Sequence, residues 1–239
     1  MDHCTAIVLA AGVGKRMQSS VAKQYLLLEG KPLIWYALQA FENSSIIEDV
    51  VLVVGPGEVL YCREEIIKKY GFTKVVSVIE GGAERYLSVW EGLKWINAHL
   101  EKDRPGYIFI HDGARPFVTE DIIKDTYEAA ARYGACVAAM PVKDTIKVAD
   151  GQELAVQTPN RKTLWAVQTP QVFEKGLITE AYSQLIGRLD KVQEQGIEIT
   201  DDAMVIETMS DRPVKLVKAS YENIKITTPE DMKLAKALL

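Results

Sequence analysis

Residues 6–17 of the chain read AIVLAAGVGKRM, a short apolar run that breaks at once into small residues and glycines. The apolar run is typical of a buried strand. Its glycine-rich end leaves backbone amides accessible, because glycine has no Cβ to obstruct an approaching anion. Three cations stand beside this loop, namely Lys15, Arg16 and Lys23. The stretch therefore predicts a polyphosphate site after the first strand.

The same loop differs from two common phosphate-binding motifs. A Walker A loop has four residues between its glycines and a Ser or Thr after the lysine, whereas Gly12 and Gly14 are one residue apart and Arg16 follows the lysine. A dinucleotide-binding fingerprint requires Gly or Ala at the position that Met17 occupies. A tight turn between a strand and a helix, without any ligand, is the alternative for this stretch taken alone.

The composition describes an ordinary globular protein. Of the 239 residues, 48% are hydrophobic, so a sizeable core can form, and no repeat or linker divides the chain. We therefore expect a single domain over residues 1–239. The formal net charge of −5 argues against a dedicated nucleic-acid or membrane-surface binder.

The sequence also predicts a cytoplasmic location. No window reaches the roughly 18 apolar residues of a membrane span, and the N-terminus lacks the apolar stretch of a signal peptide. The three cysteines are widely spaced and form no metal or disulfide pattern, which fits a reducing compartment.

Apolar runs alternate with segments of helical periodicity along the chain. Continuously apolar strands separated by helices indicate a mostly parallel sheet covered on both faces, a doubly wound α/β fold whose ligands lie at the carboxyl ends of the strands. The expected strands are 5–9, 50–54, 75–79, 107–110, 135–140 and 214–218. The expected helices are 33–41, 59–70, 86–100, 120–133, 174–189, 201–208 and one that begins at Pro229 after the N-cap Thr228.

One stretch, 144–168, interrupts this alternation because it contains no helical pattern. Residues 145–148 alternate in polarity, and Asp150-Gly151 is a strong hairpin turn. A two-stranded ribbon is only marginally stable alone. We therefore expect a β-arm, bounded at 142–168, that packs against another subunit. A solvent-exposed excursion is the alternative.

Two motifs follow predicted strands and carry polar groups. In GGAERYLS, residues 81–88, glycines and a helix start offer backbone donors, and Arg85 and Ser88 share one helix face on which a nucleobase can be recognised. An ordinary glycine turn is the alternative. Asp112 follows the strand 107–110 and is a candidate ligand of Mg²⁺, which often binds one or two carboxylates together with phosphates. A loop cap is the alternative for this acid, and we expect His111 to be structural.

Taken together, these segments resemble the 2-C-methyl-D-erythritol 4-phosphate cytidylyltransferase family along the whole chain. The motifs, in order, are LAAGVGKRM with AKQY, GGAERYLSV, HDGARPF, PVKDTIK, LWAVQTPQVF, TDDA and NIKITTPED. The resemblance implies transfer of CMP from CTP to methylerythritol phosphate, with Mg²⁺ or another divalent cation and with pyrophosphate as the second product. It also implies a Rossmann-like nucleotidyltransferase fold and a homodimer formed through the β-arm.

The resemblance further implies residue roles, which fall into three sets. The CTP phosphates would be held at Ala10, Ala11, Gly12, Arg16 and Lys23, with Arg16, Lys23 and Lys225 as the catalytic cations. The cytosine and ribose would lie against Gly82, Arg85 and Ser88, although Ala83 stands where several members carry Asp. The second substrate would contact Asp112, Arg115, Thr145, Arg161, Thr169 and Thr200. Thr145 and Arg161 would do so from the arm, in the site of the partner subunit.

Three other functions compete with this one. Ribitol 5-phosphate cytidylyltransferases share the fold and the CTP site but tend to carry LAGG and HDAVRP, where this chain has LAAG and HDGARP. A nicotinamide-dependent oxidoreductase is disfavoured by Met17 and by Val54-Gly55-Pro56, which stands where a ribose-binding acid is expected. A catalytically silent nucleotide-binding module is disfavoured because cations are retained at every expected position.

Overall fold

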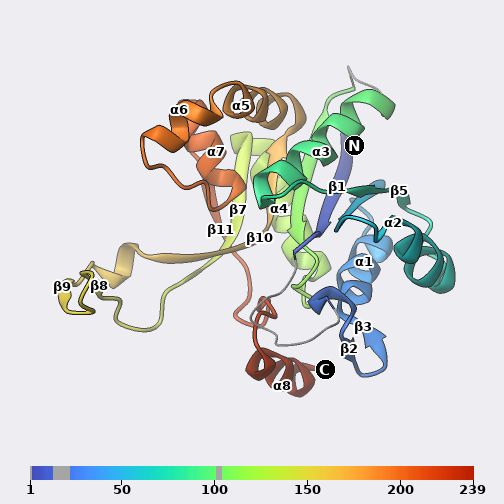
Figure 1. Cartoon of the computed structure of the whole chain (residues 1–239), viewed down its shortest axis with the longest axis horizontal. Coiled ribbons are helices and arrows are strands. Elements are labelled where there is room, and N and C mark those ends of the chain that lie inside the picture. The colour runs from blue at the N-terminus through green and yellow to red at the C-terminus, as the bar shows by residue number, and fades with distance from the viewer. Residues whose placement is uncertain (1, 13–21, 101–103) are drawn as a thin grey trace.

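The computed structural model describes residues 2–12, 22–100 and 104–239. At its centre lies a seven-stranded sheet in the order β11-β7-β10-β6-β1-β4-β5 (Figure 1). Every pairing is parallel except those of β10, which runs antiparallel to both of its neighbours. The strands are β1 (His3–Ala10), β4 (Asp49–Val54), β5 (Val75–Glu80), β6 (Gly106–Asp112), β7 (Ala135–Pro141), β10 (Trp165–Glu174) and β11 (Lys215–Lys218).

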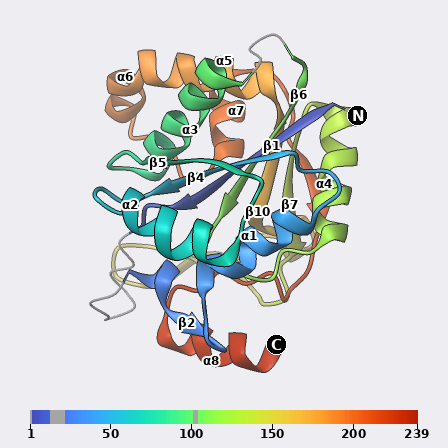
Figure 2. The same cartoon turned by 90° about the vertical axis from the view of Figure 1, so that its right-hand side faces the viewer.

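Helices cover both faces of the sheet, and Figure 2 shows α3 and α4 on opposite sides of it. The helices are α1 (Leu33–Asn43), α2 (Val59–Tyr61) continued by the π-helical η3 (Cys62–Lys68), α3 (Arg85–His99), α4 (Glu120–Tyr133), α5 (Lys175–Gly187), α6 (Leu189–Glu194), α7 (Asp202–Met209) and α8 (Pro229–Leu238). Short elements complete the chain: η2 (Lys23–Tyr25), β2 (Leu27–Leu28), β3 (Lys31–Pro32), β8 (Val148–Ala149), β9 (Ala155–Gln157) and η4 (Arg161–Thr163).

The continuously apolar strands divide their side chains between two cores. Along β1, Ala6 and Val8 pack with α1 and α4 on one face, whereas Ile7 packs with α3 and α5 on the other. Successive side chains of a strand point to opposite faces, so a strand that is covered on both sides must be apolar throughout. The predicted doubly wound fold is thus confirmed.

Side-chain caps mark two helix starts, of which the one at Thr228 was predicted from the sequence. Thr228 is the N-cap of α8 and forms a capping box with Asp231, and Pro229 occupies the first turn. Thr119 caps α4 through its side chain, which accepts a hydrogen bond from the amide of Ile122. These local signals therefore define where both helices begin.

Strand β10 differs from the sequence-based expectation. Residues 165–167 were expected in the arm, but they pair with β7 and belong to the main sheet, so the arm ends before Trp165. Pro170 cannot donate a ladder hydrogen bond, which makes this stretch a poor strand candidate in sequence. The structure accommodates Pro170 where the β10–β7 register shifts between Val167 and Gln171.

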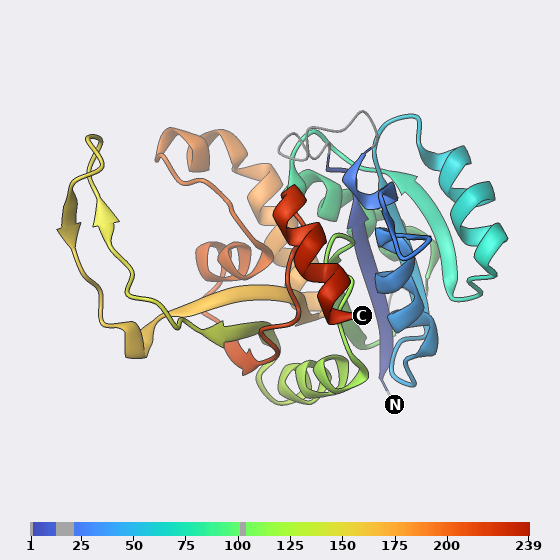
Figure 3. The same ribbon diagram turned by 90° about the horizontal axis from the view of Figure 1, so that it is seen from below.

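The expected hairpin is present and extends away from the body of the molecule (Figures 1 and 3). Its turn is longer than the Asp150-Gly151 pair predicts. The amide of Asp150 donates to the carbonyl of Leu154, and Glu153 takes the left-handed conformation with φ of 63°. This is a three-residue loop with its left-handed residue in the third position. The apolar side chains of Val148, Leu154 and Val156 are exposed on the arm.

Candidate active site

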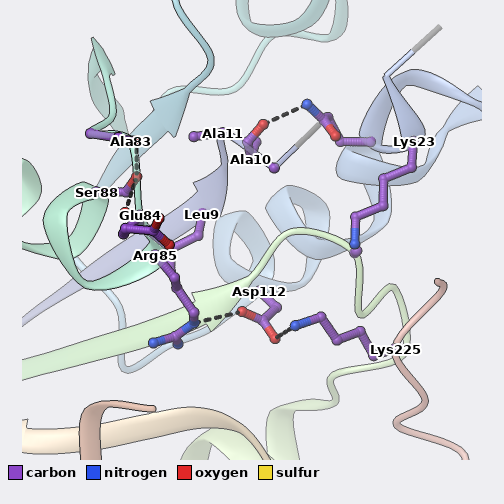
Figure 4. A pocket seen from close by; sticks show the side chains of 14 residues that line it. Leu9, Ala10, Ala11, Lys23, Ala83, Glu84, Arg85, Ser88, Asp112 and Lys225 are labelled. Carbon is purple, nitrogen blue, oxygen red and sulfur yellow. Dashed lines mark hydrogen bonds and ion pairs between the residues drawn. The ribbon is translucent and has the colours of Figure 1, made fainter. Parts of the chain in front are cut away.

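A pocket opens where the carboxyl ends of β1, β5 and β6 meet, as the predicted parallel topology requires (Figure 4). Fourteen residues from loops far apart in the sequence line it. They are Leu9, Ala10, Ala11, Gly12, Lys23, Gln24, Gly82, Ala83, Glu84, Arg85, Ser88, Asp112, Ala114 and Lys225. The structure thus brings together all the residues predicted to bind the nucleotide except Arg16, which lies outside the described residues.

The glycine turn after β5 packs tightly against the loop after β1. A Cβ on Gly81 would lie 2.6 Å from Oγ of Ser88 and 2.9 Å from Cβ of Ala11, distances that real side chains do not adopt. Ser88 is buried and donates to the loop carbonyls of Gly82 and Glu84, at 3.3 Å and 3.2 Å. The tight turn therefore joins the start of α3 to the predicted polyphosphate loop.

Lys23 reaches the pocket from the short helix η2 (Figure 4). The neighbouring residues attach this helix to the body. The side-chain amide of Gln24 donates to the carbonyl of Ala10, and the hydroxyl of Tyr25 donates to Oε2 of Glu58 at 2.7 Å. Gln24 is buried, and its side chain holds in place the short helix that carries Lys23.

Asp112 ends β6 in the midst of three cations. Its carboxylate lies 3.4 Å from Nε of Arg85, 2.8 Å from Nζ of Lys225 and 3.7 Å from Nε of Arg115. Burial alone would raise the pKa of Asp112, but the three cations outweigh it and hold the pKa far below its usual range. Asp112 is therefore ionised at neutral pH.

A second, fully buried carboxylate, that of Asp202, also pairs with Arg85. The guanidinium donates to both oxygens of Asp202, at 2.9 Å and 2.7 Å, and the hydroxyl of Tyr182 donates to the same carboxylate at 2.6 Å. Burial would lower the pKa of Arg85, but Asp202 and Asp112 raise it well above its ordinary value. Sequence reasoning missed Asp202 and Tyr182 as site residues. The TDDA motif contains Asp202, but only the fold brings it to Arg85.

A second cavity adjoins the first on the other side of Asp112. It is lined by Arg85, Asp112, Arg115, Val167, Gln168, Thr169, Gln171, Thr200, Asp201 and Lys225. Arg85, Asp112 and Lys225 line both cavities. Two ligands bound side by side would therefore meet at these three residues. Arg115, Thr169 and Thr200, predicted to contact the second substrate, line the second cavity.

Among the described residues, four cations line the two cavities, namely Lys23, Arg85, Arg115 and Lys225, and the carboxylates of Glu84, Asp112 and Asp201 line them as well. Asp202 adds a further carboxylate that pairs with Arg85. The guanidinium and ammonium groups are the donors that can bind phosphate oxygens.

Two predicted substrate residues lie outside these cavities. Thr145 and Arg161 are exposed on the arm, where the guanidinium of Arg161 donates to the carbonyl of Lys143 at 2.7 Å. Neither residue lines a cavity with the nucleotide residues of its own chain.

The described part of the chain offers no group of three His, Cys, Asp or Glu side chains that could hold a metal ion. In the two joined cavities, Asp112 is the carboxylate at their junction. Mg²⁺ commonly binds one or two carboxylates and completes its shell with phosphates and water. The residues present fit a cation that is bound mainly by the substrate phosphates.

None of the helices described is long and apolar enough to cross a lipid bilayer.

A mostly parallel sheet with an ionised acid where two cavities meet, each lined by cations, fits a nucleotidyltransferase, the class to which the relatives of this chain belong. The chain belongs to the 2-C-methyl-D-erythritol 4-phosphate cytidylyltransferase family, whose model matches residues 4–239. It is 51% identical over 237 residues to the enzyme of that name from Lachnospira eligens, with 98% of each chain covered.

Solved structures agree with this assignment. The chain is similar to 4-diphosphocytidyl-2C-methyl-D-erythritol synthase from Anaerococcus prevotii, with a TM-score of 0.81 and 30% identity over 99% of this chain and 98% of that one. It is also similar to 2-C-methyl-D-erythritol 4-phosphate cytidylyltransferase from Francisella tularensis, with a TM-score of 0.80 and 28% identity over the whole of both chains. The expected family and fold class are confirmed.

Proposed function

We propose that the two joined cavities are where this chain transfers CMP from CTP to 2-C-methyl-D-erythritol 4-phosphate and releases pyrophosphate. The observation that carries the proposal is that Arg85, Asp112 and Lys225 line both cavities. A nucleotide in the first cavity and a polyol phosphate in the second would bring their reacting phosphates to these three residues.

The first cavity is the proposed CTP site. The backbone of Ala10–Gly12 and the cation of Lys23 would hold the triphosphate, together with Arg16 from the same motif. The base and ribose would lie against Gly82, Arg85 and Ser88. Because residue 83 is Ala, the loop would recognise cytosine at this position through its backbone and not through a carboxylate.

The proposed reaction is an in-line attack on the α-phosphorus of CTP. The nucleophile is the phosphate of methylerythritol phosphate, which is already an anion, so that no general base is required. Negative charge on the α-phosphate in the transition state would be stabilised by Arg16, Lys23 and Lys225. Preorganised groups of this kind contribute about 3–4 kcal/mol each when they are well aimed.

A divalent cation fits the site under one condition. Asp112 and the substrate phosphates would hold it, and when bound it would neutralise phosphate charge. Asp112 already pairs with Arg85 and Lys225, so the carboxylate would have to exchange a contact with one of them.

The arm is proposed to complete the site in a homodimer. Its exposed apolar side chains, among them Leu154 and Val156, need cover that their own sheet does not supply. A two-fold partner would bury the same ribbon on both chains. Thr145 and Arg161 would then reach the methylerythritol phosphate in the partner's second cavity. The cytoplasmic location expected from the sequence stays a prediction.

Pyrophosphate release tests the proposed reaction. CTP, ATP, GTP and UTP are each supplied with methylerythritol phosphate or ribitol 5-phosphate, and divalent cations are then removed with EDTA. We expect turnover with CTP and methylerythritol phosphate, lost on chelation and restored by Mg²⁺. Faster turnover of ribitol 5-phosphate under matched conditions would contradict the proposed substrate.

A further inference from the structure

His111 lies directly behind the site, at the residue before Asp112, and the proposed reaction gives it no role. Its ring is completely buried and packs edge-on against Phe41, with ring centroids 5.2 Å apart. Both ring nitrogens have polar partners. Nε2 is 3.1 Å from the carbonyl oxygen of Arg115, and Nδ1 is 3.0 Å from the hydroxyl of Thr169.

The partners determine the direction of each hydrogen bond. A carbonyl can only accept, so Nε2 carries the proton and donates it to Arg115. The hydroxyl of Thr169 accepts the backbone N–H of Asp112 at 3.0 Å, which leaves its own proton for the bare Nδ1 of His111. The result is a chain of three directed bonds: Asp112 N–H to Thr169, Thr169 O–H to His111, and His111 Nε2–H to Arg115.

This series of hydrogen bonds holds the loop that carries Asp112 and Arg115. One end fixes the amide of Asp112 and the other fixes the carbonyl of Arg115, while the amide of Gly113 between them donates to the carbonyl of Leu9 at 2.8 Å. A Cβ on Gly113 would lie 3.0 Å from the carbonyl oxygen of Leu9 and closer still to Cδ1 of Ile34, so the loop is tightly packed at this residue. The carboxylate of Asp112 and the guanidinium of Arg115 are therefore aimed from behind by buried polar groups.

The hydroxyl of Thr169 is already used in this series of hydrogen bonds. Thr169 lines the second cavity, but only 3% of its surface is exposed, and its proton and one of its acceptor positions are already used. This hydroxyl therefore has no proton left to donate to a substrate phosphate. Thr169 connects β10 to the end of β6, two strands that are neighbours in the sheet.

We propose that His111, as the Nε2–H tautomer, and Thr169 are positioning residues that aim Asp112 and Arg115 at the substrates. The inference rests on the proposed function for its kinetic readout. Misplacement of reacting or charge-stabilising groups by as little as about 1 Å can lower a rate by about 100-fold. The hydrogen-bond chain supplies the placement, whereas Asp112, Arg115 and their neighbours make the contacts to the ligands.

Thr169→Val tests the proposal, because valine keeps the shape of threonine and removes the hydroxyl. We expect kcat to fall by about 10- to 100-fold because Asp112 and Arg115 lose their placement, and any rise in the KM for methylerythritol phosphate accompanies that fall. Thr169→Ser is the matched control, since it keeps the hydroxyl and should retain most of the wild-type kcat. A rise in the KM for methylerythritol phosphate with unchanged kcat would instead make Thr169 a direct substrate donor.

Nitrogen NMR of the histidine rings gives a readout that does not depend on turnover. In the ligand-free wild type at neutral pH, His111 should be the neutral Nε2–H tautomer, assigned through the loss of its signals in His111→Gln. An Nδ1–H tautomer or a doubly protonated ring would overturn the proposal, even if Thr169→Val does not fold. The Nδ1 shift should change in Thr169→Val and not in Thr169→Ser. If wild-type protein shows this tautomer but no cytidylyl transfer, the proposed function fails and the hydrogen-bond chain stands.

Discussion

At the scale of single residues, the charged side chains of the site share partners of opposite charge. Asp112 is shared by three cations, and Arg85 is shared by two carboxylates. A phosphate that enters the junction would compete with Asp112 for the same cations. The charged groups of the site are therefore paired with one another before any ligand binds, and a bound phosphate would replace one of these pairs.

Lys23 is expected to contribute to the transition state through its charge. We expect Lys23→Ala to lower kcat/KM by about 100-fold, the scale of one lost donor to the developing charge. Lys218→Ala is the matched control, since Lys218 is an exposed lysine of β11 that lines neither cavity. Far-UV circular dichroism must show native folding. Near wild-type activity in folded Lys23→Ala would remove the lysine from the mechanism.

Asp202 is expected to matter for stability as well as for activity. Asp202→Asn removes the charge that Arg85 pairs with in a fully buried position, and breaking such a pair typically costs about 3–5 kcal/mol. Tyr182→Phe removes only one hydrogen bond to the same carboxylate and should cost less, about 1–3 kcal/mol. Urea unfolding measures both values. Equal costs for the two variants would contradict the ion pair as the dominant interaction.

At the scale of elements, short connections with defined caps set the position of each functional loop. The turn after β5 is tight because Gly81 lies against both Ser88 and Ala11. Helix α8 begins at a complete capping box, directly after the segment that carries Lys225 to Asp112. The backbone amide of Ile226 also donates to the carbonyl of Ala114, which joins this segment to the loop after β6. Local capping therefore supports the placement of a site residue.

The capping box of α8 predicts a pH dependence. The carboxylate of Asp231 accepts from the amides of Thr227 and Thr228 and from the hydroxyl of Thr227. Burial would raise the pKa of Asp231, but these hydrogen bonds lower it below its ordinary value. The stability that ionised Asp231 adds to the folded protein is present above the unfolded-state pKa of about 4. It is lost as the pH falls through the pKa of Asp231 in the folded state.

Urea unfolding at pH 7 and at about pH 3 measures this effect. Asp231→Asn should destabilise the protein at neutral pH by about 1 kcal/mol and should show a smaller loss between the two pH values than the wild type. Glu230→Gln, in the same turn, is the control. An identical acid dependence in wild type and Asp231→Asn would exclude this carboxylate as a source of the effect.

At the scale of the whole molecule, the arm separates two predicted substrate residues from the site of their own chain. Thr145 and Arg161 lie on a ribbon that extends away from the sheet (Figure 3), whereas the cations for the nucleotide lie on the body. Residues from two subunits would then form each complete site. If the arm of a partner completes the site, as proposed, activity would depend on association.

Subunit mixing tests the shared site. Arg161→Ala should raise the KM for methylerythritol phosphate and leave CTP binding nearly intact, because the arm would contact only the second substrate. At a methylerythritol phosphate concentration well below the KM of Arg161→Ala, the single variants Lys23→Ala and Arg161→Ala both turn over slowly. When their chains exchange freely, one site of each heterodimer receives both wild-type groups. An equal mixture should regain about a quarter of wild-type activity. An active monomer, or no recovery after verified exchange, would refute the shared site.

The sequence by itself determined the local structure, the fold class and the family. Strand and helix periods, caps and the glycine loop are encoded within a few residues of one another, so the helix from Pro229 and the strands around β1 could be predicted directly. The predicted nucleotide residues that lie in the described part of the chain also converge in one pocket, because a parallel sheet collects its strand ends.

Only the tertiary structure decided the strand order, the place of β10 and the buried connections behind the site. Asp202 meets Arg85 across 117 positions of sequence, and Thr169 meets His111 across 58. No local pattern marks such pairs, because each side chain by itself satisfies an ordinary cap, turn or core position. These pairs form when two distant segments are buried together, because an unpaired buried polar group would cost free energy.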